Sequence, residues 1–214
     1  MPVTFHLLHG VRGGGAAQHS HSPQSMMCNA PGLEIVAPSN AADAYGLTRA
    51  AFQSNNPTVI VSHAKLLGLE SDAAKAPVPI GRADVKRRGR DVTVVANSLM
   101  THYALQAAER LAAEGIEAEV VDLRSLAPLD EETILSSVGR TGRLVVVDEC
   151  PLRCSIASEI AATVAEHGFG LLRAPIARVT RAQVPVPYSP PLEAAITPDP
   201  DKIIAAVRKV MERS

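Results

Sequence analysis

Two histidines near the start of the chain carry the side chain best suited to proton transfer at neutral pH. His19 and His21 lie two residues apart in an expected loop after the glycine run at residues 13–15, and imidazole titrates close to physiological pH. They could also bind a metal, but no Cys, Asp or Glu lies nearby to complete a ligand set, so no metal site is expected. From residue types alone, solvated loop histidines are the simpler interpretation. His63 and His102 are single histidines at the ends of expected elements and are weaker candidates.

The glycine run itself could bring bare backbone amides close to a phosphate. It follows an expected strand, but it matches neither GxGxxG nor GxxxxGK[ST], and no helix clearly begins after it. A flexible loop beside a site is the favoured interpretation.

Acids and cysteines gather where the third strand of a later repeat is expected to end. Asp148 and Glu149 lie at a strand end, where open α/β sheets bind ligands. Either could act as a general base, although acids at strand ends are commonly solvated. Cys150 and Cys154 are four residues apart, which is not the CxxC spacing of redox and zinc sites. The basic residues at 86–90 are interpreted as a solvated face.

An alternation of strand and helix patterns from residue 91 onward predicts the framework that positions these side chains. Strands are expected at 92–96, 118–123, 144–147 and 175–179, and helices at 101–114, 130–138, 155–167 and 201–211. In the first helix, apolar residues recur at helical spacing, Thr101 can cap the start and Gly115 can end it. This order predicts an α/β fold, a three-layer and mostly parallel sheet with helices on both faces.

The first 90 residues are less regular. Strands are expected at 3–8, 34–37 and 58–62, with a helix at 41–52 that Asn40 or Ser39 can cap. So few strands make a small sheet, which needs further strands or another chain at its edge. Pro, Gly and basic residues gather at 75–90, which is typical of a linker, and we place the linker at 81–90. We therefore expect two domains, 1–80 and 91–214, joined by that linker.

The composition excludes several classes of protein. The 214 residues are 46% hydrophobic with a formal net charge of −1, which argues against disorder and against a phosphate-backbone binder. Aromatic residues make up 3%, too few for base stacking on single-stranded nucleic acid. The three cysteines, the absence of a long apolar stretch and the lack of a secretion signal predict a soluble cytoplasmic protein with no membrane or nucleic-acid partner.

Several segments, in order and spread over almost the whole chain, carry a resemblance to a known family. They are AQHS at 17–20, PGLEIVAPS at 31–39, GRADVK at 81–86, VDLRSLAPLD at 121–130, TGR at 141–143 and VPVPY at 184–188. With these segments the chain resembles the beta subunit of thiamine-diphosphate-dependent 2-oxo acid dehydrogenases, a family that includes the pyruvate, branched-chain 2-oxo acid and acetoin enzymes. The resemblance implies that residues 1–80 are the second half of a pyrimidine-binding domain and residues 91–214 a transketolase C-terminal-like domain.

The same resemblance implies an activity, a cofactor and partners. The family oxidatively decarboxylates a 2-oxo acid on thiamine diphosphate and passes the acyl group to the lipoyl group of an acyltransferase core. His19 matches the family's active-site histidine, which makes it the best catalytic candidate. The alpha subunit of the family binds the diphosphate and its magnesium, so the chain is expected to act only with an alpha subunit, and self-association is also expected.

Departures from the family pattern support an alternative. The glutamate that activates the cofactor belongs to the half-domain expected to be absent. Residues 23–27 replace a stretch that carries an acid and aromatics in the family, and residues 150–156 replace a glycine-rich turn. The alternative is a catalytically incomplete remnant that serves as an assembly or interaction module. A further alternative, a stand-alone nucleotide binder, rests only on the glycine run.

Overall fold

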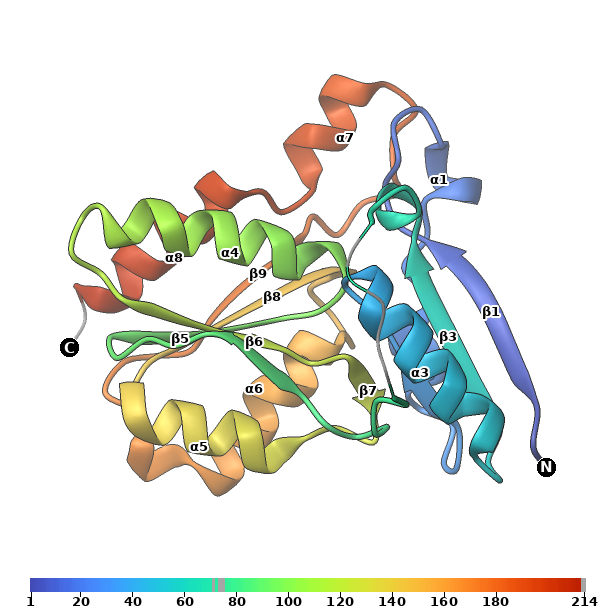
Figure 1. The fold of residues 1–214 in the computed structure, drawn as a ribbon. Helices are drawn as coiled ribbons and strands as arrows, with labels where there is room; N and C mark the ends of the chain where they lie inside the picture. Colours follow the sequence, from blue (N-terminus) through green and yellow to red (C-terminus); the bar gives the residue numbers. More distant parts are fainter. Residues whose placement is uncertain (71, 73–75, 213–214) are drawn as a thin grey trace.

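The computed structural model describes residues 1–70, 72 and 76–212, and it contains two sheets that share one core (Figure 1). Residues 71 and 73–75, inside the expected first domain, lie outside the described residues. The first sheet has the order β1-β3-β2-β7. Its strands are β1 (Thr4–His9), β2 (Glu34–Val36), β3 (Thr58–His63) and β7 (Ser125–Ala127). The strands β1, β3 and β2 are parallel, and β7 is antiparallel to β2.

The second sheet has the order β4-β6-β5-β8-β9. Its strands are β4 (Asp84–Arg87), β5 (Val92–Ala96), β6 (Ala118–Asp122), β8 (Leu144–Pro151) and β9 (Ala177–Arg181). All neighbours are parallel except β4, which is antiparallel to β6. The mostly parallel α/β fold expected from the sequence is confirmed.

Helices cover both faces of the second sheet, with α4 and α8 on one face and α5 and α6 on the other (Figure 1). The helices are α1 (Ala16–His19), α2 (Gln24–Met27), α3 (Ala41–Gln53), α4 (Leu99–Ala112), α5 (Glu131–Thr141), α6 (Ile156–His167), α7 (Pro190–Ile196) and α8 (Pro200–Met211). Two 3-10 turns lie at Ala64–Leu66 and Phe169–Leu171. Among the described residues, none of these helices combines the length and apolar character needed to cross a membrane.

Several elements differ from the sequence-based expectations. A one-turn helix, α1, directly follows the glycine run where no helix was expected, and α7 lies in the expected Pro-rich crossing. The helix expected at 130–138 continues past Gly139 to Thr141, because Gly142 rather than Gly139 takes the left-handed conformation (φ +71°) that ends a helix.

The segment expected to be a linker contains β4. Two of its basic residues are paired rather than solvated: the Lys86 ammonium lies 2.7 Å from Asp84 and 3.0 Å from Asp43, and the Arg87 guanidinium lies 2.6 Å from Glu117. The pairs with Asp43 and Glu117 attach β4 to its surroundings, whereas the side chains of Arg88 and Arg90 are exposed.

Apolar side chains from both sheets meet in one core. Ile35 and Val61 of the first sheet pack in the same cluster as Val146 of β8 and Ile160 of α6. A second cluster lies between the opposite face of the second sheet and helices α4 and α8. Because both sheets contribute to the first cluster, the loops at their facing ends are held close together.

Candidate functional site

His19 lies at the rim of a small cavity at the carboxyl end of β1. The cavity has a volume of about 200 Å³ and is lined by Leu8, His9, Arg12, Gln18, His19, His21 and Pro23. His19 ends α1, and its side chain is exposed, as is that of His21. The structure therefore brings together both histidines singled out in the sequence, and it adds His9 and Arg12. Imidazole and guanidinium groups around one cavity favour an anionic ligand.

His9 is a buried member of this cavity that sequence analysis overlooked. Its ring meets that of His63 edge to face, with centroids 5.0 Å apart, and its Nε2 lies 3.4 Å from the Ser98 hydroxyl. Burial, together with the neighbouring His63, lowers the pKa of His9 to about 4, although Glu149 opposes the shift. His9 is therefore a neutral imidazole at pH 7.

A buried pair of His63 and Glu149 lies behind His9. The backbone N–H of Lys65 donates to His63 Nδ1 (3.1 Å), so the ring proton resides on Nε2, which lies 2.6 Å from Glu149 Oε2. Burial alone would raise the pKa of Glu149, but the hydrogen bonds from His63 Nε2–H and from the Val11 N–H hold it below its usual value. Glu149 is thus ionised at neutral pH.

The buried positions of Asp148 and Glu149 correct the expectation of solvated acids at a strand end. Their residues are 0% and 3% exposed, because β8 is an internal strand and the loops of the first sheet cover its end. No periodicity in the sequence signals this cover. His102 has a structural contact instead: its Nε2 lies 2.6 Å from the Ser39 carbonyl oxygen.

The glycine run does not offer its amides to a phosphate. The N–H groups of Gly14 and Gly15 donate to Glu193 Oε1 on α7, at 3.0 and 3.2 Å. A carboxylate already occupies the position that a phosphate would take, and it would repel a diphosphate. The residues of this loop therefore do not fit the diphosphate of a thiamine cofactor. Within the described part of the chain, no group of three or more His, Cys, Asp or Glu is placed to hold a metal ion.

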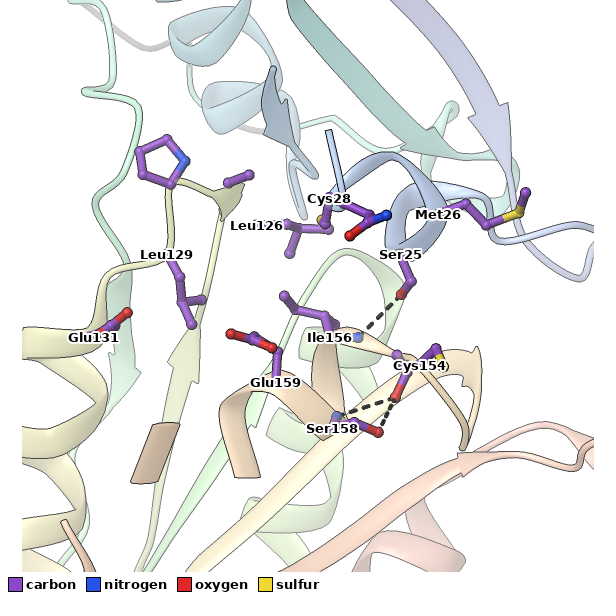
Figure 2. Close-up of a pocket in the computed structure, with 14 residues that line it drawn as sticks. Ser25, Met26, Cys28, Leu126, Leu129, Glu131, Cys154, Ile156, Ser158 and Glu159 are labelled. Atoms are coloured by element: carbon purple, nitrogen blue, oxygen red, sulfur yellow. Dashed lines mark hydrogen bonds between the residues drawn. The ribbon is translucent and has the colours of Figure 1, made fainter. Parts of the chain in front are cut away.

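A larger cavity of about 810 Å³ lies on the other side of the 20–28 segment (Figure 2). Its lining comes from α2 and the residues after it, from the β7–α5 connection and from the start of α6. Ser25 joins two of these parts: its hydroxyl donates to Cys150 Sγ (3.2 Å) and accepts from the Ile156 N–H (3.1 Å). The two segments that depart from the family pattern, 23–27 and 150–156, thus meet at one cavity.

Comparison with protein families gives two matches along the chain. Residues 81–203 match the family model for the transketolase C-terminal domain, and residues 1–69 match that for the transketolase pyrimidine binding domain. The second match agrees with the thiamine-diphosphate-dependent family that the sequence resembles.

Similar sequences are beta subunits of dehydrogenases. The chain is 46% identical over 213 residues to the acetoin:2,6-dichlorophenolindophenol oxidoreductase subunit beta of Cupriavidus necator, covering 99% of the chain and 63% of that protein. It is 42% identical to the 2-oxoisovalerate dehydrogenase subunit beta of Bacillus subtilis, covering 99% and 66%. It is 41% identical to the mitochondrial pyruvate dehydrogenase E1 component subunit beta of Pisum sativum, covering 100% and 61%. The chain thus spans less than two thirds of these relatives.

Similar structures agree with this assignment. A split gene transketolase, described as an inactive beta4 tetramer, superimposes with a TM-score of 0.84 at 28% identity, covering 99% of this chain and 67% of that one. A Pichia stipitis transketolase mutant superimposes with a TM-score of 0.68 at 13% identity, covering 99% and 30%, which shows the shared fold. The chain therefore belongs to the transketolase family, and within it is similar to the beta subunits of acetoin, branched-chain 2-oxo acid and pyruvate dehydrogenases.

Proposed function

We propose that this protein is a beta-type subunit of the decarboxylating component of a 2-oxo acid or acetoin dehydrogenase. The observation that carries the proposal is the identity of 41–46% over nearly the whole chain to three such subunits. Because these relatives are named as subunits of enzymes, they favour the enzyme over an assembly or interaction module. The free cysteines fit action in the cytoplasm, where thiols stay reduced.

In this proposal His19 is the catalytic residue. Its exposed imidazole lies at the rim of the small cavity, where it can reach a bound molecule and give or take a proton. Arg12 adds a permanent positive charge to the same cavity, and the neutral ring of His9 forms part of its buried wall. A carboxylate or another anionic group of the substrate fits this lining better than a cationic one.

The cofactor and its metal are proposed to depend on a second chain. Thiamine diphosphate would be shared with an alpha subunit that also holds magnesium. The carboxylate of Glu193 at the glycine-rich loop supports this division, because it fills the place where backbone amides would receive a phosphate. A lipoyl acyltransferase core is the proposed acceptor of the acyl group.

The test of the function is a reconstitution with an alpha subunit of this enzyme class. With pyruvate, 2-oxoisovalerate and acetoin offered in turn, we expect turnover on one of them and none from the chain alone. His19→Ala is expected to lower acyl transfer to a lipoyl acceptor by roughly 100-fold or more, since a positioned acid or base contributes at least that factor. His167→Ala, which removes an exposed histidine at the end of α6, is the matched control.

Two results would contradict the proposal. One is turnover by the isolated chain, and the other is unchanged acyl transfer by His19→Ala. Far-ultraviolet circular dichroism of both histidine variants should match that of the parent, because an exposed imidazole buries little apolar area.

A further inference from the structure

The loop that leads into α1, which ends at His19, has an unusual backbone conformation, and side chains from distant parts of the chain hold it in place. Gly10, Gly13 and Gly14 have φ values of +94°, +89° and +74°, and Ala16 has +49°. Such a path makes neither helix nor sheet hydrogen bonds, so the loop amides need partners elsewhere. Within the loop region, Gly10 donates to the His21 carbonyl (3.0 Å).

Two buried carboxylates from the second half of the chain supply partners for three further amides of the loop. The Val11 N–H donates to Glu149 Oε1 (2.5 Å), and the N–H groups of Gly14 and Gly15 converge on Glu193 Oε1. Glu149 and Glu193 are each 3% exposed. They lie on β8 and α7, and Figure 1 shows α7 beside α1. Hydrogen bonds to charged groups are among the strongest that hold a loop in place.

The pair with His63 in turn fixes the orientation of the Glu149 carboxylate. Oε2 accepts a hydrogen bond from His63 Nε2–H, which leaves Oε1 directed at the Val11 amide. Gly10 packs directly against the His63 ring, since a Cβ at this position would lie only 2.1 Å from Nε2. The start of the loop is therefore fitted to the His63–Glu149 pair, and the end of the loop is held by Glu193.

We propose that Glu149 and Glu193 are positioning residues that hold the glycine-rich loop at residues 10–15, and thereby keep His19 at the rim of its cavity. The inference rests on the proposed function for the role of His19. Neither glutamate lines that cavity. They act through the backbone on a residue 130 to 174 positions earlier in the chain.

Amide hydrogen exchange of the full chain, followed by mass spectrometry, tests the positioning role. Glu193→Ala is expected to speed exchange at residues 13–15 by roughly 10-fold or more, because two charge-assisted hydrogen bonds are lost. Glu193→Gln keeps an acceptor oxygen and should retain most of the protection. Glu166→Ala, at an exposed glutamate of α6, is the control, and peptides from β5 and α4 should exchange unchanged in every variant.

A second variant keeps the test decisive if Glu193→Ala does not fold. Glu149→Ala removes the acceptor of Val11 and should speed exchange at residues 10–12 by roughly 10-fold. Exchange equal to that of Glu166→Ala, in whichever of the two variants folds, would overturn the proposal.

Activity of the reconstituted complex gives the matching readout. Glu193→Ala should lower kcat for acyl transfer by roughly 10-fold while KM for the 2-oxo acid changes little, and Glu193→Gln should restore kcat. An unchanged kcat in Glu193→Ala would also overturn the proposal. Failure of the proposed function can be told apart from failure of the positioning role. The first shows as unchanged acyl transfer in His19→Ala, whereas the second shows in the hydrogen exchange of the loop, which does not depend on activity.

Discussion

Burial shifts the pKa of several ionisable side chains in this protein away from the charged form. Asp148 is fully buried, and burial raises its pKa to about 6, although its hydrogen bond from the Cys150 N–H (3.2 Å) opposes the shift. Burial lowers the pKa of His9, as expected for a base, and raises the pKa of Cys150, as expected for an acid. Each of these groups is neutral, or costly to ionise, near pH 7.

The raised pKa of Asp148 predicts a pH-dependent stability. In the folded state Asp148 is protonated below about pH 6, whereas in the unfolded state it is protonated only below about pH 3.8. Ionising the buried carboxylate therefore lowers the free energy of unfolding as the pH rises from about 4 to 6, and the loss reaches its full size above pH 6. Asp148→Asn should therefore raise the free energy of unfolding at pH 7 by up to about 3 kcal/mol, and by less at pH 5. Urea unfolding at both pH values measures this, with Glu166→Gln as control. An equal gain at both pH values would contradict the assignment.

The three cysteines should differ in reactivity. The thiolate is the reacting form, and burial raises the pKa of Cys28 to about 11 and that of Cys150 further, whereas Cys154 is exposed. At pH 8 we expect one fast equivalent of iodoacetamide modification, abolished by Cys154→Ser, and reaction of Cys28 slower by about 100-fold. Mass spectrometry of the modified peptides identifies the site. Fast modification of Cys150 would show that its surroundings are more open than the structure places them.

The ends of the helices follow local chemistry that is visible in the sequence. Asn40, Asp130 and Ser155 each accept a backbone N–H from the third residue that follows, which is the usual N-terminal cap. One exception is α4, which begins at Leu99 rather than at the expected Thr101. The Thr101 hydroxyl instead donates to the buried Asp122 (3.2 Å), so a tertiary contact uses the group expected to cap.

Asp130 joins two elements, and its removal should cost more than an ordinary cap. One carboxylate oxygen accepts from the Thr133 N–H (3.1 Å), and the other accepts from the Ala83 N–H (2.9 Å) just before β4. Asp130→Ala should lower the free energy of unfolding by about 1–2 kcal/mol, measured by urea unfolding. Ser136→Ala on the exposed face of α5 is the control and should change stability by less than about 0.5 kcal/mol. A loss no larger than that of the control would contradict the cap.

At the scale of the whole molecule, the first sheet has an open edge. Among the described strands, β1 pairs with β3 alone, and four of its six residues are exposed, among them Phe5 and Leu8. Such an edge is a template for another chain. We propose that this strand takes part in self-association or in contact with a partner subunit.

Replacing an apolar residue on this edge should weaken association. Phe5 is 53% exposed, and Phe5→Lys places a charge on the proposed contact. We expect sedimentation velocity at micromolar concentration to show an oligomer for the parent chain and a shift toward monomer for Phe5→Lys. Phe169→Lys, at another exposed phenylalanine after α6, is the matched control and should leave the distribution unchanged. A parent chain that is strictly monomeric would contradict the proposal.

The sequence by itself determined the four strand–helix repeats after residue 91, the cap of α3 and the resemblance that singles out His19, because these depend on periodicity and on residues close in the chain. The division into two domains at 81–90 remains a prediction, since β4 lies in that segment and β7 joins the first sheet. Only the tertiary structure decided that His9, His63, Glu149 and Glu193 belong to the surroundings of His19. Their burial and partners come from contacts between parts of the chain up to 179 residues apart, and no local pattern encodes which distant side chain will cover a strand end.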